Sequence, residues 1–301
     1  MLEIPDMLEN RLSNADRPVL VSDERAVAPA ELTTQPHARI VGLETILPLL
    51  QSPDCDDPLT QEANGGGLTD SRHTYPLKGT LPLLIPARLQ PHFTDRLAVT
   101  MAQSRDAFLQ YFLLASIKQS GEITAAPDNV HFQRHLFRMK AFVQDCKGLV
   151  LDVGCDDPTT SAALFPPTAE YVGLDPFCVR REPFRLIGLG EFLPFRAASV
   201  ANVVFNTSLD HILDWHRAIA EARRVLKPGG CLYLATLIWE SHADLMNDSV
   251  HFHHFRLPEL LAGLFGFSVE SSIAYDYKGD VHRYGLYLVA RKTSSSLAQE
   301  A

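Results

Sequence analysis

The sequence has no long hydrophobic run. Nowhere in its 301 residues does a stretch of about 18 apolar residues occur, the length that a membrane-spanning helix needs. The N-terminal region also lacks a basic segment followed by an apolar one, which is the pattern of a secretory signal peptide. We therefore expect a cytoplasmic protein with no membrane partner.

Cysteine and positive charge are also scarce. The five cysteines, at positions 55, 146, 155, 178 and 231, are scattered and odd in number, so we expect reduced thiols rather than a disulfide framework. The formal net charge is −9 and the isoelectric point is about 5.7. Proteins dedicated to nucleic acids usually show a basic stripe, so no nucleic-acid partner is expected.

The composition is that of an ordinary soluble globular protein, with 46% hydrophobic and 21% charged residues. A chain of this length can form a full core and a second small domain. Changes of pattern along it predict five segments. They are a mobile arm (1–39), a β-rich module (40–90), a helical bridge or cap (91–145), an α/β domain (146–292) and a tail (293–301).

One stretch organises the α/β domain. Leu149 to Val153 is a short apolar run that ends at Gly154, as expected for a buried parallel strand. Residues 159–164 suit a short helix, and a second apolar run ends in Asp175. Gly154 would let a ligand approach the backbone, and the Asp175 carboxylate can accept hydrogen bonds from two ribose hydroxyls. An ordinary βαβ unit with a solvent-facing acid fits these two features equally well.

Strands and helices continue to alternate after this unit. Further strands are predicted at 184–188, 200–205, 231–237, 268–275 and 283–289, and helices at 215–225 and 257–265. The last two strands could pair antiparallel. The alternation predicts a doubly wound sheet that binds its ligand at the carboxyl ends of its strands. Five features fall at those ends: the Gly154 turn, Asp175, Glu191, Asn206 and His211.

Helices are also predicted before the α/β domain, within 91–120 and 131–146, from apolar residues at helical spacing. The second of these would lead directly into the first strand. Apolar and aromatic faces of this kind more often pack in a core than contact a cofactor.

The module at 40–90 resembles the short Trm112-like zinc ribbon that often accompanies bacterial methyltransferases. Tyr75-Pro76 and Leu81-Pro82 match that pattern, but Ser52 replaces the first cysteine and only Cys55 remains of the first pair. The second pair would fall at Leu68 and Ser71. A structural zinc site needs four Cys or His ligands, and Cys55 with His73 supplies only half of them. We expect no metal here, and a small β-unit packed against its neighbour.

Residues from about 148 to 292 resemble a class I S-adenosylmethionine-dependent methyltransferase, of the UbiE-like, methyltransferase domain 11 type. The matching motifs are Leu-Asp-Val-Gly-Cys (151–155), Val-Gly-Leu-Asp (172–175), Gly-Glu-Phe-Leu-Pro-Phe (190–195), Leu-Asp-His-Ile (209–212) and Ala-Arg-Arg-Val-Leu-Lys-Pro-Gly-Gly (222–230). The last motif is the most specific. The resemblance implies a Rossmann-like, mostly parallel, seven-stranded sheet, preceded by the small β-rich module and helices.

The resemblance also implies roles for residues at a site for S-adenosylmethionine. Asp152 and the backbone of Val153, Gly154 and Cys155 would line the methionine part of the cofactor. The ribose would be held by Asp175, with Pro176 after it. Beyond these, Glu191 and Phe192 would flank the adenine, and Asn206 would face the methionine end.

One turn departs from the family pattern. The family usually continues Gly-Cys-Gly-x-Gly, whereas this chain has Asp156-Asp157-Pro158. The two added carboxylates would favour the ammonium of a bound amino acid but repel its carboxylate. Pro158 stiffens the turn and removes an N–H group.

Several histidines are candidates for the acceptor side. His211 lies just beyond the fourth strand and titrates near neutral pH, so it is the first candidate for a general base, with Asp210 as the alternative. His211 could equally only cap or pack the next helix. His251, His253 and His254 are expected to contact substrate or pack rather than bind metal, because the run His251-Phe-His-His-Phe255 itself contains no acid or Cys.

Three functions remain open at this point. The first is an active methyltransferase on a small molecule, with a sugar or surface-glycan precursor as one class of acceptor. The second is a catalytically inactive relative that binds the cofactor or serves as an interaction protein. The third is a dinucleotide-dependent oxidoreductase, which is the weakest because the Gly-x-Gly-x-x-Gly fingerprint is absent. The sequence leaves the oligomeric state open.

Overall fold

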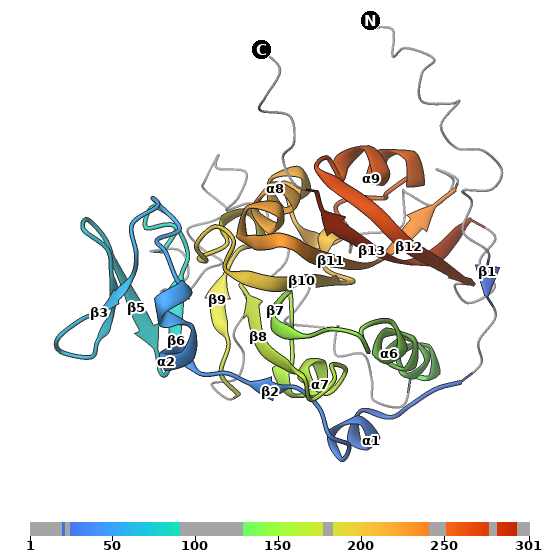
Figure 1. The fold of residues 1–301 in the computed structure, drawn as a ribbon, viewed down its shortest axis with the longest axis horizontal. Coiled ribbons are helices and arrows are strands. Elements are labelled where there is room, and N and C mark those ends of the chain that lie inside the picture. Colours follow the sequence, from blue (N-terminus) through green and yellow to red (C-terminus); the bar gives the residue numbers. More distant parts are fainter. Residues whose placement is uncertain are drawn as a thin grey trace, which may run out of the picture.

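A mixed β-sheet runs through the molecule (Figure 1). The computed structural model describes residues 20–21, 25–90, 129–176, 183–240, 251–276 and 282–293. Its central strands lie in the order β9–β8–β7–β10–β11–β13–β12. They are β7 (Gly148–Val153), β8 (Ala169–Asp175), β9 (Leu186–Gly188), β10 (Val200–Asn206), β11 (Leu226–Trp239), β12 (Phe267–Asp276) and β13 (Arg283–Lys292).

The first five of these strands in that order are parallel, and β13 runs antiparallel to both of its neighbours, β11 and β12. The expected Rossmann-like, mostly parallel, seven-stranded sheet is confirmed. An antiparallel strand between β11 and β12 distinguishes this sheet from the all-parallel order that dinucleotide-binding folds use.

Side chains of the central strands alternate between two cores. In β7, Leu149, Leu151 and Val153 face one core, and Val150 faces the other. Helices α8 (Trp215–Val225) and α9 (Leu257–Gly263) cover the first core. The second is covered by α1 (Pro29–Thr33), α6 (Val130–Phe142) and α7 (Pro158–Ala162) (Figure 1). This two-sided burial explains why the strands read as continuous apolar runs.

Helix α8 forms for the reasons that its sequence suggests. The Asp214 carboxylate accepts the backbone N–H of Arg217 at 3.0 Å, and Trp215, Ala218, Ile219, Ala222 and Val225 are buried along one face. Strand β11 begins directly after the helix, so it is longer than the predicted 231–237. The expected helix at 131–146 is confirmed as α6.

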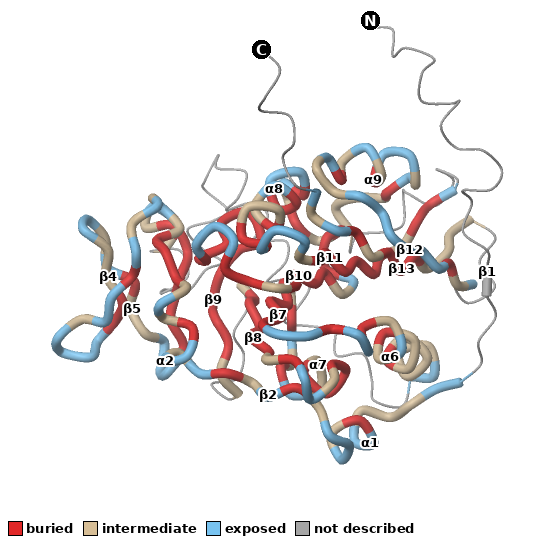
Figure 2. The backbone as a smooth tube through the Cα atoms, viewed as in Figure 1, coloured by how far each residue is buried: buried red, intermediate tan, exposed pale blue. Residues whose placement is uncertain are grey.

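The β-rich module is joined to the main sheet. Its antiparallel strands are β3 (Thr60–Gln61), β4 (Gly67–Thr69), β5 (Thr74–Lys78) and β6 (Leu81–Leu84), preceded by α2 (Leu43–Ile46) and η1 (Leu47–Leu49). Strand β6 pairs in parallel with β9, and the pairing extends the central sheet at that edge. Buried apolar side chains from both parts fill the seam, where every residue of β6 and β9 is buried (Figure 2). The expected packing of the module on its neighbour is confirmed.

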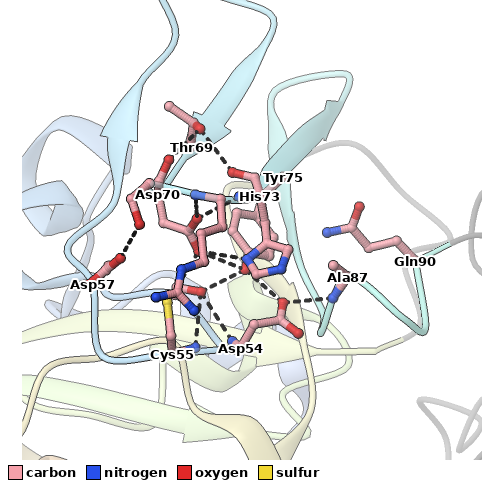
Figure 3. A network of polar contacts seen from close by, with 12 residues as sticks. Asp54, Cys55, Asp57, Thr69, Asp70, His73, Tyr75, Ala87 and Gln90 are labelled. Carbon is pink, nitrogen blue, oxygen red and sulfur yellow. Dashed lines mark hydrogen bonds and ion pairs between the residues drawn. The ribbon is translucent and has the colours of Figure 1, made fainter.

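A network of polar contacts occupies the module where ribbon modules hold metal (Figure 3). Its centre is the Asp70 carboxylate, which accepts the backbone N–H groups of Arg72 and His73, each at 2.6 Å. Cys55 Sγ, His73 Nδ1 and Tyr75 Oη also lie within 3.5 Å of Asp70 Oδ2.

The positions in this network differ from the expected ligand positions. Leu68 is fully buried among apolar residues, and Ser71 donates its hydroxyl to the Asp57 carboxylate. The side chains that come together are those of Ser52, Cys55, Asp70 and His73, with Tyr75 between them. Asp70 and His73, rather than Leu68 and Ser71, therefore lie beside Cys55.

Part of the expected mobile arm is packed against the α/β domain. Leu32 of α1 is fully buried in the second core, and β2 (Arg39–Ile40) pairs in parallel with the start of β8. Strand β1 (Leu20–Val21) pairs with β12. The predicted helices within 91–120, the turn at 278–280 and the tail after residue 293 lie outside the described residues. No helix in the described ranges is long and apolar enough to cross a membrane.

Candidate functional site

The turn after β7 is tied to two neighbouring segments. Gly154 has a φ of +81°, and a Cβ there would lie 2.4 Å from the Cβ of Ser208. Only glycine fits such a conformation and such a close approach. Ser208 donates its hydroxyl to the Val153 carbonyl at 2.5 Å, and the Gly154 N–H donates to the Leu174 carbonyl at 2.8 Å. The turn is therefore fixed between the ends of β8 and β10.

Asp175 lies at the end of β8, directly over this turn. Its buried carboxylate accepts the backbone N–H of Asp156 at 3.1 Å. Asp156 itself has a φ of +46°, and Arg185 donates to its carbonyl. Pro176 follows at the half-buried rim, where the described chain is interrupted until residue 183. The Asp175 carboxylate is thus fixed at the end of β8, and its expected contact with ribose stays a prediction.

The free backbone N–H groups at the N-terminus of α7 are capped by the side chain of Asp157, the residue that precedes the helix. Asp157 accepts the backbone N–H groups of Thr159 and Thr160 at 3.2 and 3.3 Å, and the Thr160 hydroxyl at 2.7 Å. Pro158 has no N–H to offer. Dinucleotide-binding folds place a pyrophosphate at this point. The capped helix therefore argues against the dinucleotide-dependent oxidoreductase.

Asp152 is a buried acid with one unsatisfied oxygen. Its side chain faces the second core, where Tyr171 donates to Oδ2 at 2.8 Å while Oδ1 has no hydrogen-bond partner among the described residues. Burial raises the pKa of this carboxyl from 3.8 to about 7, and the Tyr171 hydrogen bond opposes the rise. An orphaned buried acceptor of this kind suits a cationic ligand group, such as the ammonium of an amino acid. Cys155 turns its side chain inward, against Gly173.

Asn206, at the end of β10, is oriented by a histidine that the sequence analysis missed. His135 of α6 lies between Asn206 Oδ1 and the Tyr287 hydroxyl, with Nε2 at 2.8 Å from the first and Nδ1 at 2.6 Å from the second. Asn206 Oδ1 can only accept, so Nε2 carries the proton and Nδ1 accepts from Tyr287. Burial lowers the pKa of His135 from 6.5 to about 4, which keeps the ring neutral. A lone histidine in an amphipathic helix gives no sequence signal for this role.

Glu191 and Phe192 lie in the short η2 turn (Gly190–Phe192), beside the start of α8. Glu191 Oε1 accepts the Asp214 N–H at 3.3 Å, and burial raises the pKa of the carboxyl to about 7. The Arg217 guanidinium carbon lies 4.0 Å from the centre of the Phe192 ring. The Glu191 carboxylate thus joins η2 to α8, and its expected contact with adenine stays a prediction.

Two of the candidate residues for catalysis lie together with one of the three candidate substrate residues. His211 Nε2 lies 4.0 Å from Asp210 Oδ1, and His251 Nε2 lies 3.7 Å from Asp210 Oδ2. His253 is turned away and contacts the backbone carbonyls of Ile212 and Leu213. His254 packs its ring on Trp239, with 4.5 Å between the ring centres. Of the three histidines, therefore, only His251 lies beside Asp210, and His253 and His254 have other contacts.

A groove of about 650 Å³ lies away from these residues, at the amino-terminal edge of the parallel strands. It is lined by the end of α6, the 227–231 segment of β11 and parts of β12 and β13. None of the predicted site residues lines it.

Residues 151–234 match the family described as a methyltransferase domain. This match covers less than a third of the chain and includes the Gly154 turn, Asp175, Glu191, Asn206, Asp210 and His211. A protein of transposon TN4556 from Streptomyces fradiae is 33% identical over 105 residues, which are 30% of this chain and 30% of that protein.

Solved structures show the same fold at low identity. Burkholderia thailandensis 1,6-didemethyltoxoflavin-N1-methyltransferase, solved with 1,6-didemethyltoxoflavin and S-adenosylhomocysteine, is 18% identical, covers 64% of this chain and 92% of its own, and has a TM-score of 0.50. An S-adenosylmethionine-dependent methyltransferase from Mesorhizobium loti is 15% identical, covers 51% and 95%, and has a TM-score of 0.40. Together with the domain match, the first of these establishes the fold of the class I S-adenosylmethionine-dependent methyltransferases. The UbiE-like subtype and the zinc-ribbon resemblance of the module stay predictions.

Proposed function

We propose that this protein is an S-adenosylmethionine-dependent methyltransferase that acts on a small molecule. The observation that carries the proposal is the buried Asp175 carboxylate, held over the Gly154 turn beside a helix whose N-terminus is already capped. This arrangement offers a ribose-binding acid but no phosphate site. It suits a nucleoside cofactor without a pyrophosphate.

Each part of the cofactor has a matching group in the site. Asp175 would accept hydrogen bonds from the ribose hydroxyls, and the unsatisfied Oδ1 of Asp152 would face the amino-acid ammonium. The side chain of Asn206, fixed by His135, would orient the methionine end. When bound, S-adenosylmethionine supplies an electrophilic methyl group, and the protein's contribution is alignment and exclusion of water.

The acceptor side of the proposal rests on the groups that follow β10. His211 would take the proton of an acceptor hydroxyl or ammonium at Nε2, with the Asp210 carboxylate 4.0 Å away to favour the imidazolium. A small-molecule acceptor is supported by the name of the Burkholderia thailandensis enzyme, which methylates 1,6-didemethyltoxoflavin. Imidazole and carboxylate groups at this edge suit a hydroxylated acceptor, such as a sugar or a surface-glycan precursor.

Calorimetric titration with S-adenosylmethionine and S-adenosylhomocysteine tests the cofactor part. We expect micromolar binding, equivalent to about −8 kcal/mol. Asp175→Ala should weaken it at least about 100-fold, because it removes two hydrogen bonds to a charged group, each contributing about 1.5–3 kcal/mol.

Glu170→Gln is the matched control, because Glu170 is a carboxylate of the same strand, at its other end, where it contacts Arg39 on the surface. Its affinity for the cofactor should equal that of the wild type. A folded protein that binds neither compound would exclude the methyltransferase and favour the inactive relative. Equal affinity of wild type and Asp175→Ala would place the cofactor elsewhere.

A further inference from the structure

The carboxylate of Asp210 is buried, and one of its two oxygens lacks a hydrogen-bond partner among the described residues. The residue is only 2% exposed, and the oxygen concerned is Oδ1. Leaving a buried carboxylate oxygen unpaired is costly, so native structures usually pair such atoms or use them to bind a ligand. The Oδ1 atom therefore indicates a missing positively charged partner.

Two imidazole nitrogens converge on the same carboxylate. One ligand atom each from Asp210, His211 and His251 can be chosen so that all three lie within 4.8 Å of one another. The nitrogen–oxygen distances of 4.0 and 3.7 Å are too long for hydrogen bonds. Ligands about 2.1 Å from a tetrahedral metal ion stand about 3.4 Å apart. The two histidine–aspartate distances would shorten by roughly half an ångström, and the widest pair of the set, within 4.8 Å, by up to about 1.4 Å, which side-chain rotation can supply.

The backbone holds the two segments of this cluster together. The carbonyl of Asp210 accepts the N–H groups of Phe252 and His253 at 2.9 and 3.2 Å. His253 adds a second connection, because its Nε2 lies 2.9 Å from the Ile212 carbonyl. His251 is thus fixed beside the short η3 turn (Leu209–His211), as a preformed site requires.

We propose that Asp210, His211 and His251 bind one divalent first-row transition-metal ion of the zinc type. Two imidazoles and one carboxylate are a ligand set that suits such ions, whereas magnesium and calcium prefer oxygen ligands throughout. The side chains of His211 and His251 are 36% and 20% exposed, so one side of the site is open to water or to an acceptor oxygen. Three protein ligands with an open position are typical of catalytic rather than structural sites.

This proposal replaces the expected absence of a metal, and with the ion bound it also replaces the base role that the proposed function gives to His211. An imidazole nitrogen that binds an ion cannot also accept a proton. The ion would instead lower the pKa of a coordinated acceptor hydroxyl, and this catalytic role rests on the proposed function. Binding of the ion does not rest on it.

Titration of the chelator-treated full-length protein with Co²⁺ tests the site, followed by competition with Zn²⁺. We expect one Co²⁺ per chain with visible absorption typical of nitrogen and oxygen ligands, and displacement by one equivalent of Zn²⁺. Asp210→Asn and His251→Ala should each weaken binding by at least about 100-fold, since even partners outside the ligand set typically contribute 10–100-fold. Circular dichroism establishes whether each variant is folded. If either variant is unfolded, His211→Ala takes its place, because a partly exposed side chain can be removed at less cost to the fold.

His254→Ala is the matched control, because it removes an imidazole of the same run that packs on Trp239 and is not one of the three proposed ligands. Its affinity for Co²⁺ should stay within about threefold of the wild type. The proposal is overturned if the wild type takes up no stoichiometric Co²⁺, or if binding persists in both Asp210→Asn and His251→Ala. It is equally overturned if His254→Ala weakens binding as much as His251→Ala does.

Titration of the metal-free protein with S-adenosylhomocysteine distinguishes failure of the metal site from failure of the proposed methyltransferase function. Cofactor binding without metal binding would reject the metal site alone. Metal binding without cofactor binding would reject the methyltransferase alone.

Discussion

Two buried carboxylates, each beside histidine, differ in how well their oxygens are satisfied. In the β-rich module, Asp70 accepts two backbone N–H groups and lies within hydrogen-bonding distance of the Cys55, His73 and Tyr75 side chains (Figure 3). Asp210, at the strand ends of the α/β domain, leaves Oδ1 without a partner. The first carboxylate holds a structure together, and the second is available to bind.

The comparison shows that ligand spacing alone does not identify a metal site. Ser52 with Cys55, and Asp70 with His73, have the two-residue separations of a zinc ribbon. Protein donors nevertheless fill this site. Burial acts to raise the pKa of Asp70, but hydrogen bonds from Ser52 and the 72–73 backbone outweigh it and hold the pKa well below its ordinary value. Asp210 and His251 are not separated by the short spacing typical of metal ligands, yet their side chains lie close together in the fold.

The largest expected difference between the two carboxylates is in stability. Asp70→Ala should lower the free energy of unfolding by about 4 kcal/mol, because it removes the acceptor shared by two backbone N–H groups and several side chains, most of them partly buried. Asp210→Asn, in the presence of a chelator, should change it by no more than about 1 kcal/mol, because it removes an unsatisfied charge. Urea unfolding of both variants measures the two effects. Similar losses in the two variants would contradict the comparison.

The pH dependence of stability sharpens the comparison by adding Asp152, a second unsatisfied acid at the strand ends. Its folded-state pKa, about 7, is above the ordinary value of 3.8, so the folded protein binds the proton more tightly than the unfolded chain. The free energy of unfolding should therefore fall as pH rises from about 4 to about 7, by up to roughly 3 kcal/mol for this group. Asp152→Asn should flatten that fall when unfolding is measured at several pH values.

Asp70→Asn is the matched control for this pH series. The Asp70 pKa is lowered, so its contribution to stability is present above about pH 4 and is lost as pH falls further. Its removal should leave the slope between pH 4 and 7 unchanged. Glu191, whose pKa is also raised to about 7, accounts for part of the slope that remains in Asp152→Asn. An unchanged slope in Asp152→Asn would show that the pKa of Asp152 is not raised in the folded protein.

The smallest effect is expected for Cys55→Ser. The thiol is a weak donor, 3.5 Å from Asp70 Oδ2, and serine replaces it with a stronger donor on a shorter bond. The free energy of unfolding should change by less than about 0.5 kcal/mol, and the Co²⁺ stoichiometry should stay the same. A lower stoichiometry in Cys55→Ser would assign the ion to the module instead.

Periodicity predicted the elements of the α/β domain well because its strands and helices bury whole faces. The apolar run ending at Gly154, the acid at Asp175 and the cap at Asp214 all follow from local requirements of strands, turns and helix ends. The resemblance implied a Rossmann-like, mostly parallel sheet, and the structure adds the order of its strands.

The amino-acid sequence by itself determined the sheet, its two-sided burial and the place of the Gly154 turn, because these depend on patterns a few residues long. Only the tertiary structure decided which polar groups find partners. His135 lies 71 positions from Asn206 in the sequence but contacts it in the fold. His251 is likewise distant from Asp210 in the sequence and close to it in the fold. Hydrogen-bond satisfaction depends on atoms brought together by packing, and no local pattern encodes it.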